Sequence, residues 1–205
     1  SIIGSVELLE NDLVQPEDRP RFLGRIHQEA QRLVSLINDI LGLSQLDEGA
    51  AMPRESVSLL SLAQEAAASL SAAAQAQNVT LTVNGTAGTL TGVRRLLSET
   101  VRNLCENAVK YNVPGGSVTV TVAETPQAVT LTVADTGIGI PPADQSRVFE
   151  RFYRVDKSHS RAIGGTGLGL SIVKHAVAYH HGTVQLDSTP GQGTVITVTL
   201  PRDAA

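Results

Sequence analysis

The stretch that decides the fold is Gly164–Leu170, GGTGLGL, which runs directly into Ser171–Gly182, SIVKHAVAYHHG. Four of its seven residues are glycine, although glycine loses more backbone freedom on folding than any other residue. The apolar spacing that follows predicts a helix over residues 167–181. Glycines at a helix start expose backbone N–H groups, and the helix dipole favours an anion there. The stretch therefore predicts a phosphate-binding helix start and a hinge for the segment before it.

Further helices and strands surround this stretch in the second part of the chain. Alternating apolar residues and threonine predict strands with one buried and one wet face at residues 79–83, 117–122, 129–134 and 194–200. Helical spacing appears at residues 59–77, 93–111 and 167–181. Three helices that cover one face of such a sheet make a two-layer α/β sandwich.

The first part of the chain, Ser1 to about Gly49, has no strand pattern. Ile2, Val6, Leu9 and Leu13 form the apolar stripe of one helix, and Pro16 and Pro20 mark a turn. A heptad seam then predicts a second helix, through the residues Leu23, Ile26, Ala30, Leu33, Val34, Ile37 and Ile40. We expect a second copy of the chain to cover this seam, giving a homodimeric four-helix bundle through residues 1–47. A hairpin that packs on its own C-terminal domain is the alternative.

Composition restricts the class of protein. The 205 residues are 41% hydrophobic and only 3% aromatic, so aliphatic side chains must build the core. A net charge of −4 argues against binding to nucleic acid. No apolar run reaches the ~18 residues of a membrane span, no signal peptide opens the chain, and the single Cys105 fits a reducing cytosol. We therefore expect a cytoplasmic protein.

Two polar motifs point to a nucleotide. Asn103, Asn107 and Lys110 share one face of the helix predicted at residues 93–111, where they suit either solvated surface amides or a Mg²⁺-polyphosphate group. Asp135, in DTGIGI (Asp135–Ile140), follows a strand and precedes Gly137 and Gly139. A polar turn explains this motif when it is taken alone, whereas a carboxylate beside glycines also suits the amine of an adenine ring.

Two further segments complete this set of motifs. Glu150–Arg161, ERFYRVDKSHSR, is basic and contains aromatic residues, which fits either a charged surface loop or a phosphate lid. Gly191–Thr194, GQGT, is a second Gly-x-Gly turn in front of the last strand.

Together these motifs resemble the conserved boxes of the sensor histidine kinases. NLCENAVKY, DTGIGI, VFERFYRVDKS, GGTGLGL and GQGT are similar to the asparagine, first glycine, phenylalanine, second glycine and third glycine boxes. EAQRLVSLINDILGLSQLDEG resembles the second helix of the family's dimerisation and phosphotransfer domain. The resemblance implies an α+β fold, with a helical hairpin over residues 1–50 and an ATP-binding sandwich over residues 54–203. That sandwich is shared with heat-shock chaperone, topoisomerase and mismatch-repair ATPases.

The resemblance also implies roles for individual residues. Asn107 would bind Mg²⁺, Asp135 would accept from the adenine amine, and Thr194 would lie near the base through a water. Arg154 and the backbone of residues 165–170 would hold the phosphates. The full set of ATP-binding residues implied in this way is Asn103, Asn107, Lys110, Tyr111, Asp135, Gly137, Gly139, Ile140, Phe149, Tyr153, Arg154, Gly165, Thr166, Gly167, Leu168, Gly169, Leu170 and Thr194.

Two departures bear on the reaction. ATP-hydrolysing relatives on this fold place a glutamate one turn before the metal-binding asparagine, and Asn103 occupies that position here, which favours phosphoryl transfer over hydrolysis. The family's phosphoacceptor motif, similar to His-Glu-x-x-Thr-Pro, is missing, and we expect none of the five histidines to replace it: His27, His159, His175, His180 and His181. We expect a fragment of a kinase that phosphorylates its own helix and then a response regulator. The alternative is a dimeric nucleotide-sensing module without phosphotransfer. By the resemblance the chain would be the cytoplasmic portion of a membrane-anchored bacterial sensor, with membrane contact only through segments outside it.

Overall fold

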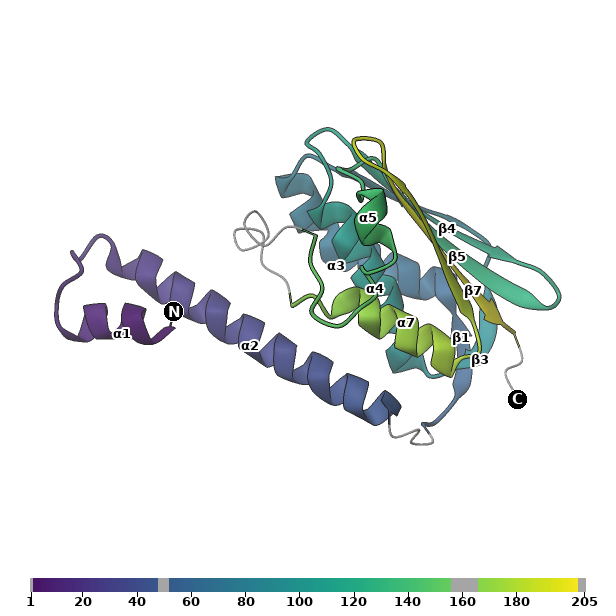
Figure 1. Ribbon diagram of the computed structural model, residues 1–205, viewed down its shortest axis with the longest axis horizontal. Coiled ribbons are helices and arrows are strands. Elements are labelled where there is room, and N and C mark those ends of the chain that lie inside the picture. Colours follow the sequence, from purple (N-terminus) through teal and green to yellow (C-terminus); the bar gives the residue numbers. More distant parts are fainter. Residues whose placement is uncertain (1, 48–51, 156–165, 203–205) are drawn as a thin grey trace.

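The computed structural model describes residues 2–47, 52–155 and 166–202. It begins with a helical hairpin, in which α1 (Ile2–Glu10) folds back on the much longer α2 (Arg19–Asp47) (Figure 1). Pro20 lies in the first turn of α2, where its missing N–H leaves no hydrogen bond unmade. The turn includes Asp12 in the left-handed region, at φ 52°, and Arg19 forms an ion pair with its carboxylate.

The second part of the chain is the predicted two-layer sandwich. Its main sheet has the strand order β2-β4-β5-β7-β6, with β2 and β4 parallel and all other neighbours antiparallel. The strands are β2 (Thr80–Gly85), β4 (Ser117–Glu124), β5 (Ala128–Asp135), β6 (Thr183–Thr189) and β7 (Gly193–Pro201). A small separate sheet pairs β1 (Glu55–Ser58) with β3 (Thr89–Gly92).

One face of the main sheet carries the core. The inward positions of β4 and β5 are fully buried, at Val118, Val120, Val122, Val129, Leu131 and Val133. Helices α3 (Leu59–Ala76), α4 (Arg94–Lys110) and α7 (Gly169–Tyr179) cover this face, as Figure 1 shows. The threonines between the buried positions face the other side of the sheet. The expected alternation of buried apolar residues and outward threonine is confirmed.

Helix α2 forms a further layer beside α7 (Figure 1). Leu36 of α2 packs against Leu168 and Ile172, which lie at the start of α7. At the other end of α7, the Tyr179 hydroxyl accepts a hydrogen bond from the Met52 amide at 3.2 Å. The hairpin thus contacts the domain that follows it, but its heptad seam stays open: Leu33 is 47% and Ile37 54% exposed.

The sequence patterns missed several short or edge elements. These are β1, β3, β6 and the four-residue helix α5 (Pro142–Gln145). The sequence also gives no sign of the role of His180, which lies just after the end of α7. Its side chain is buried, and burial lowers its imidazole pKa. Its Nε2 accepts the Val93 N–H at 2.9 Å, which requires the neutral ring.

No helix within the described residues is long and apolar enough to cross a membrane.

Candidate functional site

Asp135, the last residue of β5, has a carboxylate that backbone amides hold in place. Its Oδ1 accepts the N–H of Gly137 at 2.8 Å and the N–H of Thr194 at 3.3 Å. Partial burial raises the pKa of this carboxyl, and the two amide hydrogen bonds act in the opposite direction. Among the described residues, Oδ2 receives no hydrogen bond. One oxygen is therefore fixed by the fold, while the other remains available to a ligand.

The glycines after Asp135 occupy positions where a side chain has no room. A Cβ on Gly137 would lie 2.3 Å from the Tyr111 carbonyl oxygen. Gly139 has a φ of +68°, and its Cβ would lie 2.2 Å from the Thr189 carbonyl oxygen. The N–H of Ile138, which lies between them, donates to the Tyr111 carbonyl at 3.1 Å. This hydrogen bond joins the Asp135 turn to the end of α4.

The polar stripe of α4 leads from this junction to the glycine-rich stretch. Asn103, Asn107 and Lys110 are all half-buried. A Cβ on Gly169 would lie 2.9 Å from the Asn103 Oδ1, so this amide rests directly on the backbone at the start of α7. The Lys110 Nζ lies 5.2 Å from the centre of the Tyr111 ring, within the range of a cation–π contact.

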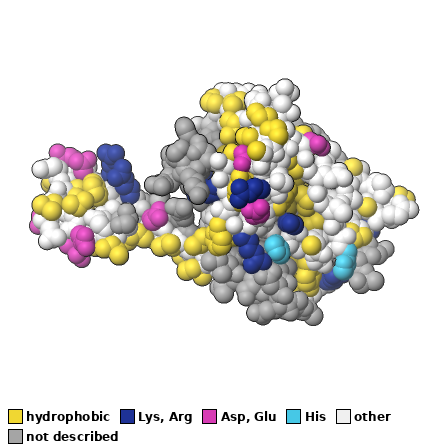
Figure 2. Space-filling model, viewed as in Figure 1, with side chains coloured by type: hydrophobic (Ala, Val, Ile, Leu, Met, Phe, Trp, Pro, Cys, Tyr) yellow, Lys and Arg dark blue, Asp and Glu magenta, His cyan; other side chains and the backbone are white. Residues whose placement is uncertain are grey.

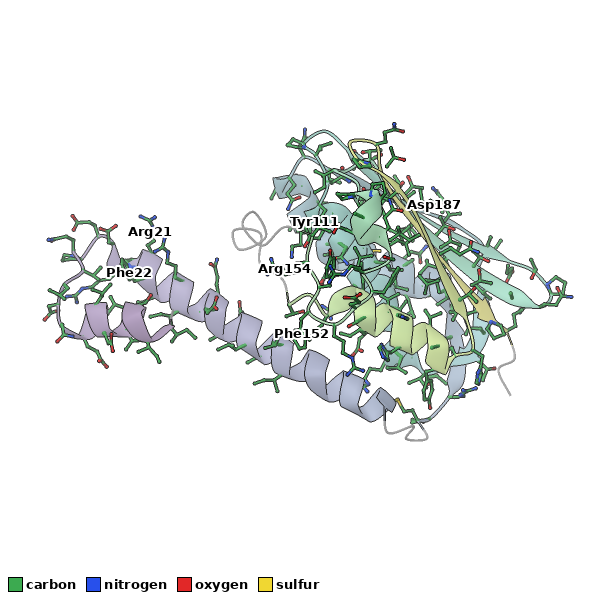
Figure 3. All side chains as sticks on the ribbon, in the orientation of Figure 1. Arg21, Phe22, Tyr111, Phe152, Arg154 and Asp187 are labelled. Atoms are coloured by element: carbon green, nitrogen blue, oxygen red, sulfur yellow. The ribbon has the colours of Figure 1, made fainter. Side chains whose placement is uncertain are left out.

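Positive charge gathers on the same side of the domain. Arg154 lies close enough to Tyr111 to oppose the rise that burial causes in the pKa of that phenol. Both side chains are labelled in Figure 3, on the side of the domain that faces the hairpin. In the space-filling view, Lys and Arg side chains lie over the front of the domain near α7, with Asp or Glu side chains among them (Figure 2).

Tyr153 contacts residues a few positions earlier in the chain, and the two phenylalanines before it differ in exposure. The Tyr153 hydroxyl donates to the Asp144 Oδ1 at 2.5 Å, and the Arg147 guanidinium stacks 4.3 Å from the Tyr153 ring centre. These contacts hold the start of the predicted lid to α5 and the residues just after it. Phe149 is half-buried, while Phe152 is exposed and adopts a φ of 63° (Figure 3).

The glycine-rich stretch contributes backbone rather than side chains. Gly167, at φ +74°, accepts the Phe152 N–H on its carbonyl at 2.9 Å, so the start of the predicted lid lies against the glycine-rich stretch. The Thr166 hydroxyl accepts the Leu168 N–H at 3.2 Å. The Leu168 side chain is fully buried, and Leu170 packs on the main core, so neither points to a ligand. Gly165 and His159 lie outside the described residues.

Cys105 and Glu106, between the two asparagines of α4, are placed away from this polar stripe. Cys105 is buried, and burial raises its thiol pKa to about 12. Glu106 forms an ion pair with Arg102 at 2.9 Å. Neither side chain is positioned as a base beside Asn107.

Sequence reasoning missed several residues that hold the Asp135 side of the site. Ser188 bonds to the Ile140 amide and to the Thr194 hydroxyl, each at 2.8 Å. Gln145 donates to the carbonyls of Ile140 and Ser188. Ser188 lies in an edge strand without a strong apolar pattern, and its proximity to GQGT was the one signal that could have found it. Predicted residues that do come together are Asp135, Gly137 and Thr194, and separately Asn103 with Gly169.

Comparison with known proteins identifies the family of this chain. Residues 92–204 match the family model of the histidine kinase-, DNA gyrase B- and HSP90-like ATPases, and residues 1–49 match the His kinase A (phospho-acceptor) domain. The chain belongs to the histidine kinases. It is 37% identical to the sensor-like histidine kinase SenX3 of Mycolicibacterium smegmatis, across 97% of this chain and 53% of SenX3. It is also 37% identical to the probable sensor histidine kinase TcrY of Mycobacterium tuberculosis, across 99% of this chain and 42% of TcrY.

Solved structures of histidine kinases share the fold of the whole chain. Acinetobacter baumannii AdeS superposes with a TM-score of 0.81 at 17% identity, covering 98% of this chain and 93% of the AdeS chain. Full-length ShkA in complex with AMPPNP superposes with a TM-score of 0.77 at 27% identity, covering all of this chain and 43% of ShkA. This histidine kinase chain thus spans about half the length of the curated relatives it matches. The expected α+β fold, a helical hairpin followed by an ATPase-type sandwich, is confirmed.

Proposed function

We propose that this chain binds Mg²⁺-ATP and is the kinase core of a two-component sensor. In this function the γ-phosphate passes from ATP to a histidine of the dimerisation domain, and then to an aspartate of a response regulator. The observation that carries the proposal is the Asp135 carboxylate: two backbone amides fix one oxygen, and the other is free beside glycines that have no room for a side chain. Such a fixed acceptor against bare backbone fits the exocyclic amine of a flat ring.

The remaining site residues divide between base and phosphates. Asp135, Gly137, Gly139, Ile140 and Thr194 form the base side. The cations Lys110 and Arg154, the amide of Asn103 and the backbone from Thr166 to Leu170 form the phosphate side, because helix N-termini and cations favour anions. The Ile138–Tyr111 hydrogen bond joins the two sides. Full-length ShkA, which has been solved in complex with AMPPNP, supports an adenine nucleotide as the ligand.

Asn107 is the proposed Mg²⁺ ligand. Its half-buried carboxamide on α4 offers one hard oxygen, and Mg²⁺ is usually held by one or two protein ligands, phosphate oxygens and waters. Within the described residues, no group of three His, Cys, Asp or Glu side chains could hold a metal alone, so the phosphates would supply the other ligands. When bound, the ion would neutralise charge on the transferring phosphoryl group.

Phosphoryl transfer fits the site better than ATP hydrolysis. Asn103 stands one turn before Asn107 and cannot accept a proton from water, and Glu106 is paired with Arg102 instead. We propose that the acceptor is a histidine other than the five in this chain. Of these, His27 is exposed on α2 and His180 is buried as a hydrogen-bond acceptor.

The open seam of α2 supports a homodimer. Leu23, Leu33, Val34 and Ile37 are all exposed in the single chain, and heptad spacing suits burial against other helices. We propose residues 1–50 as the dimerising hairpin, with contact through residues 1–47, and residues 54–203 as the ATP-binding domain. The whole protein would be a membrane-anchored bacterial sensor, of which this chain is a cytoplasmic part.

Two measurements on the 205-residue chain test this function. Calorimetry is expected to show one Mg²⁺-ATP bound per chain. Incubation with γ-labelled ATP is expected to leave the five histidines unlabelled, because positioning governs phosphoryl transfer and no acceptor motif is present. A variant with a His-Glu-x-x-Thr-Pro segment added before Ser1 is expected to gain acid-labile label.

No ATP binding would refute the proposal, and label on one of the five histidines would refute the acceptor assignment. ATP binding without label in the extended variant would favour the nucleotide-sensing module.

A further inference from the structure

The Ser188 hydroxyl, on edge strand β6, is a junction of three hydrogen bonds. Its Oγ lies 2.8 Å from the Ile140 amide nitrogen, 3.0 Å from the Gly193 carbonyl oxygen and 2.8 Å from the Thr194 Oγ1. These partners come from the Asp135 turn and from the start of β7. Ser188 faces Thr194 directly across the β6–β7 ladder.

Counting hydrogens gives one arrangement in which all three contacts are hydrogen bonds. The Ile140 N–H can only donate, and the Gly193 carbonyl can only accept. Since a serine hydroxyl has one hydrogen, that hydrogen goes to Gly193, and the Ser188 oxygen accepts from Ile140. In the arrangement that makes all three hydrogen bonds at once, the Thr194 hydroxyl donates its own hydrogen to Ser188. The Thr194 Oγ1 then has only lone pairs to offer a ligand, so it acts as an acceptor.

Thr194 and Asp135 lie side by side at the base side of the site. They are partners in the β5–β7 ladder, and the Thr194 N–H donates to the Asp135 Oδ1 at 3.3 Å. The free atom of Asp135, its Oδ2, is an acceptor. Because the Thr194 hydroxyl hydrogen is donated to Ser188, the Asp135 Oδ2 and the Thr194 Oγ1 are both acceptors.

We infer that Ser188 is a specificity-determining residue, which sets the Thr194 hydroxyl as an acceptor and so makes the site select adenine over guanine. The inference rests on the proposed ATP-binding function. Adenine carries an amine at the ring position where guanine carries a carbonyl oxygen. Two acceptors in direct contact with this ring position match the amine and oppose the carbonyl. Ser188 acts through Thr194 and has no contact of its own with the base.

Removal of the Ser188 hydroxyl frees the Thr194 hydrogen. In Ser188→Ala, the Thr194 hydroxyl can rotate and donate to a guanine carbonyl. Polar groups left unpaired against the wrong ligand are what give such sites their discrimination. We expect the ratio of the GTP to the ATP dissociation constant to fall by about tenfold, the size of one hydrogen-bond mismatch.

Calorimetry of ATP and GTP binding to the full chain tests the inference, with four variants. Ser188→Ala and Thr194→Val should each lower the GTP/ATP ratio, and the double variant should match Thr194→Val, since Ser188 acts only through Thr194. Ser188→Thr keeps a hydroxyl and should retain the wild-type ratio. Thr197→Val is the matched control: it removes a hydroxyl from the outer face of the same strand, and that hydroxyl makes no hydrogen bond within the described part of the chain.

The outcomes separate this inference from the function on which it rests. If the wild-type chain does not bind ATP, the proposed function fails. If it binds ATP and GTP equally, the function stands and the inference is wrong. If Ser188→Ala weakens ATP and GTP by the same factor, Ser188 only braces the Ile140 turn, and the inference is again wrong. Should Ser188→Ala not fold, an unchanged ratio in Thr194→Val overturns the inference independently.

Discussion

The substitution Asp135→Asn separates the structural role of this side chain from its proposed role in binding. The amides of Gly137 and Thr194 both donate to Oδ1, at 2.8 and 3.3 Å. These two donors should hold the asparagine oxygen in the same place, because a flipped side chain would place its NH₂ group against the two backbone N–H groups. The asparagine NH₂ group then takes the position of Oδ2, where it meets the adenine amine donor to donor.

The structure predicts that Asp135→Asn affects the stability of the fold and its affinity for nucleotide differently. Burial raises the Asp135 pKa, so the fold disfavours the charged form, and a neutral isostere should not lower the melting temperature. Binding loses a hydrogen bond to a charged acceptor, which contributes about 1.5–3 kcal/mol. ATP and ADP affinity should therefore fall roughly ten- to a hundredfold.

Isothermal calorimetry with ATP and ADP, alongside thermal unfolding, measures both effects. Asp187→Asn is the matched control, because Asp187 is exposed on β6 of the same sheet (Figure 3). It should leave nucleotide affinity unchanged. Wild-type affinity for ATP and ADP in a folded Asp135→Asn chain would refute the adenine assignment. A large fall in melting temperature would show that the carboxylate is mainly structural.

Three further predictions concern metal, assembly and pH. Asn107→Ala should abolish the Mg²⁺ dependence of ATP binding while adenosine still binds; calorimetry with and without Mg²⁺ that shows wild-type dependence contradicts it. Leu33→Asp combined with Ile37→Asp should halve the mass found by light scattering, because charge on the seam opposes burial; an unchanged mass places the dimer interface elsewhere. For His180, the unfolded chain binds a proton near pH 6.5 and the folded chain only at lower pH, so the free energy of unfolding should be constant above that pH and fall as the pH drops below it. Urea unfolding between about pH 5 and 8 measures this, and His180→Gln should show a smaller fall than the wild type.

The sequence predicted the main elements because their patterns are periodic over long segments. Val118, Val120 and Val122 alternate with threonine, and the helix from Arg94 to Lys110 repeats its apolar face over four turns, so the period alone identified a strand and a helix. Strands β1 and β3 have only four residues each, too few to show a period. Edge strand β6 is only half-buried on its inner face, which weakens its apolar signal.

The candidate site could be predicted only in part, because its supports depend on tertiary contacts. Motif order indicated Asp135, Asn107 and the glycines, and their residue types carry the chemistry. Nothing local marks Ser188 as a junction of three bonds, since its partners lie five, six and 48 residues away. The buried role of His180 could not be predicted for the same reason: its Nε2 accepts the N–H of Val93, which lies at the start of another helix, 87 residues earlier.

Cys105 gives this protein a built-in reporter of its own opening. It is the one cysteine in the sequence, and it is buried on α4 with a thiol pKa of about 12. Alkylating reagents attack the thiolate, so at neutral pH the folded chain should react only when α4 is transiently exposed. A ligand that binds the folded state alone suppresses that exposure by the factor 1 + [L]/Kd. The alkylation rate of the unmodified chain should therefore measure nucleotide binding without a dye or an added label, and the nucleotide concentration that halves the rate equals the Kd.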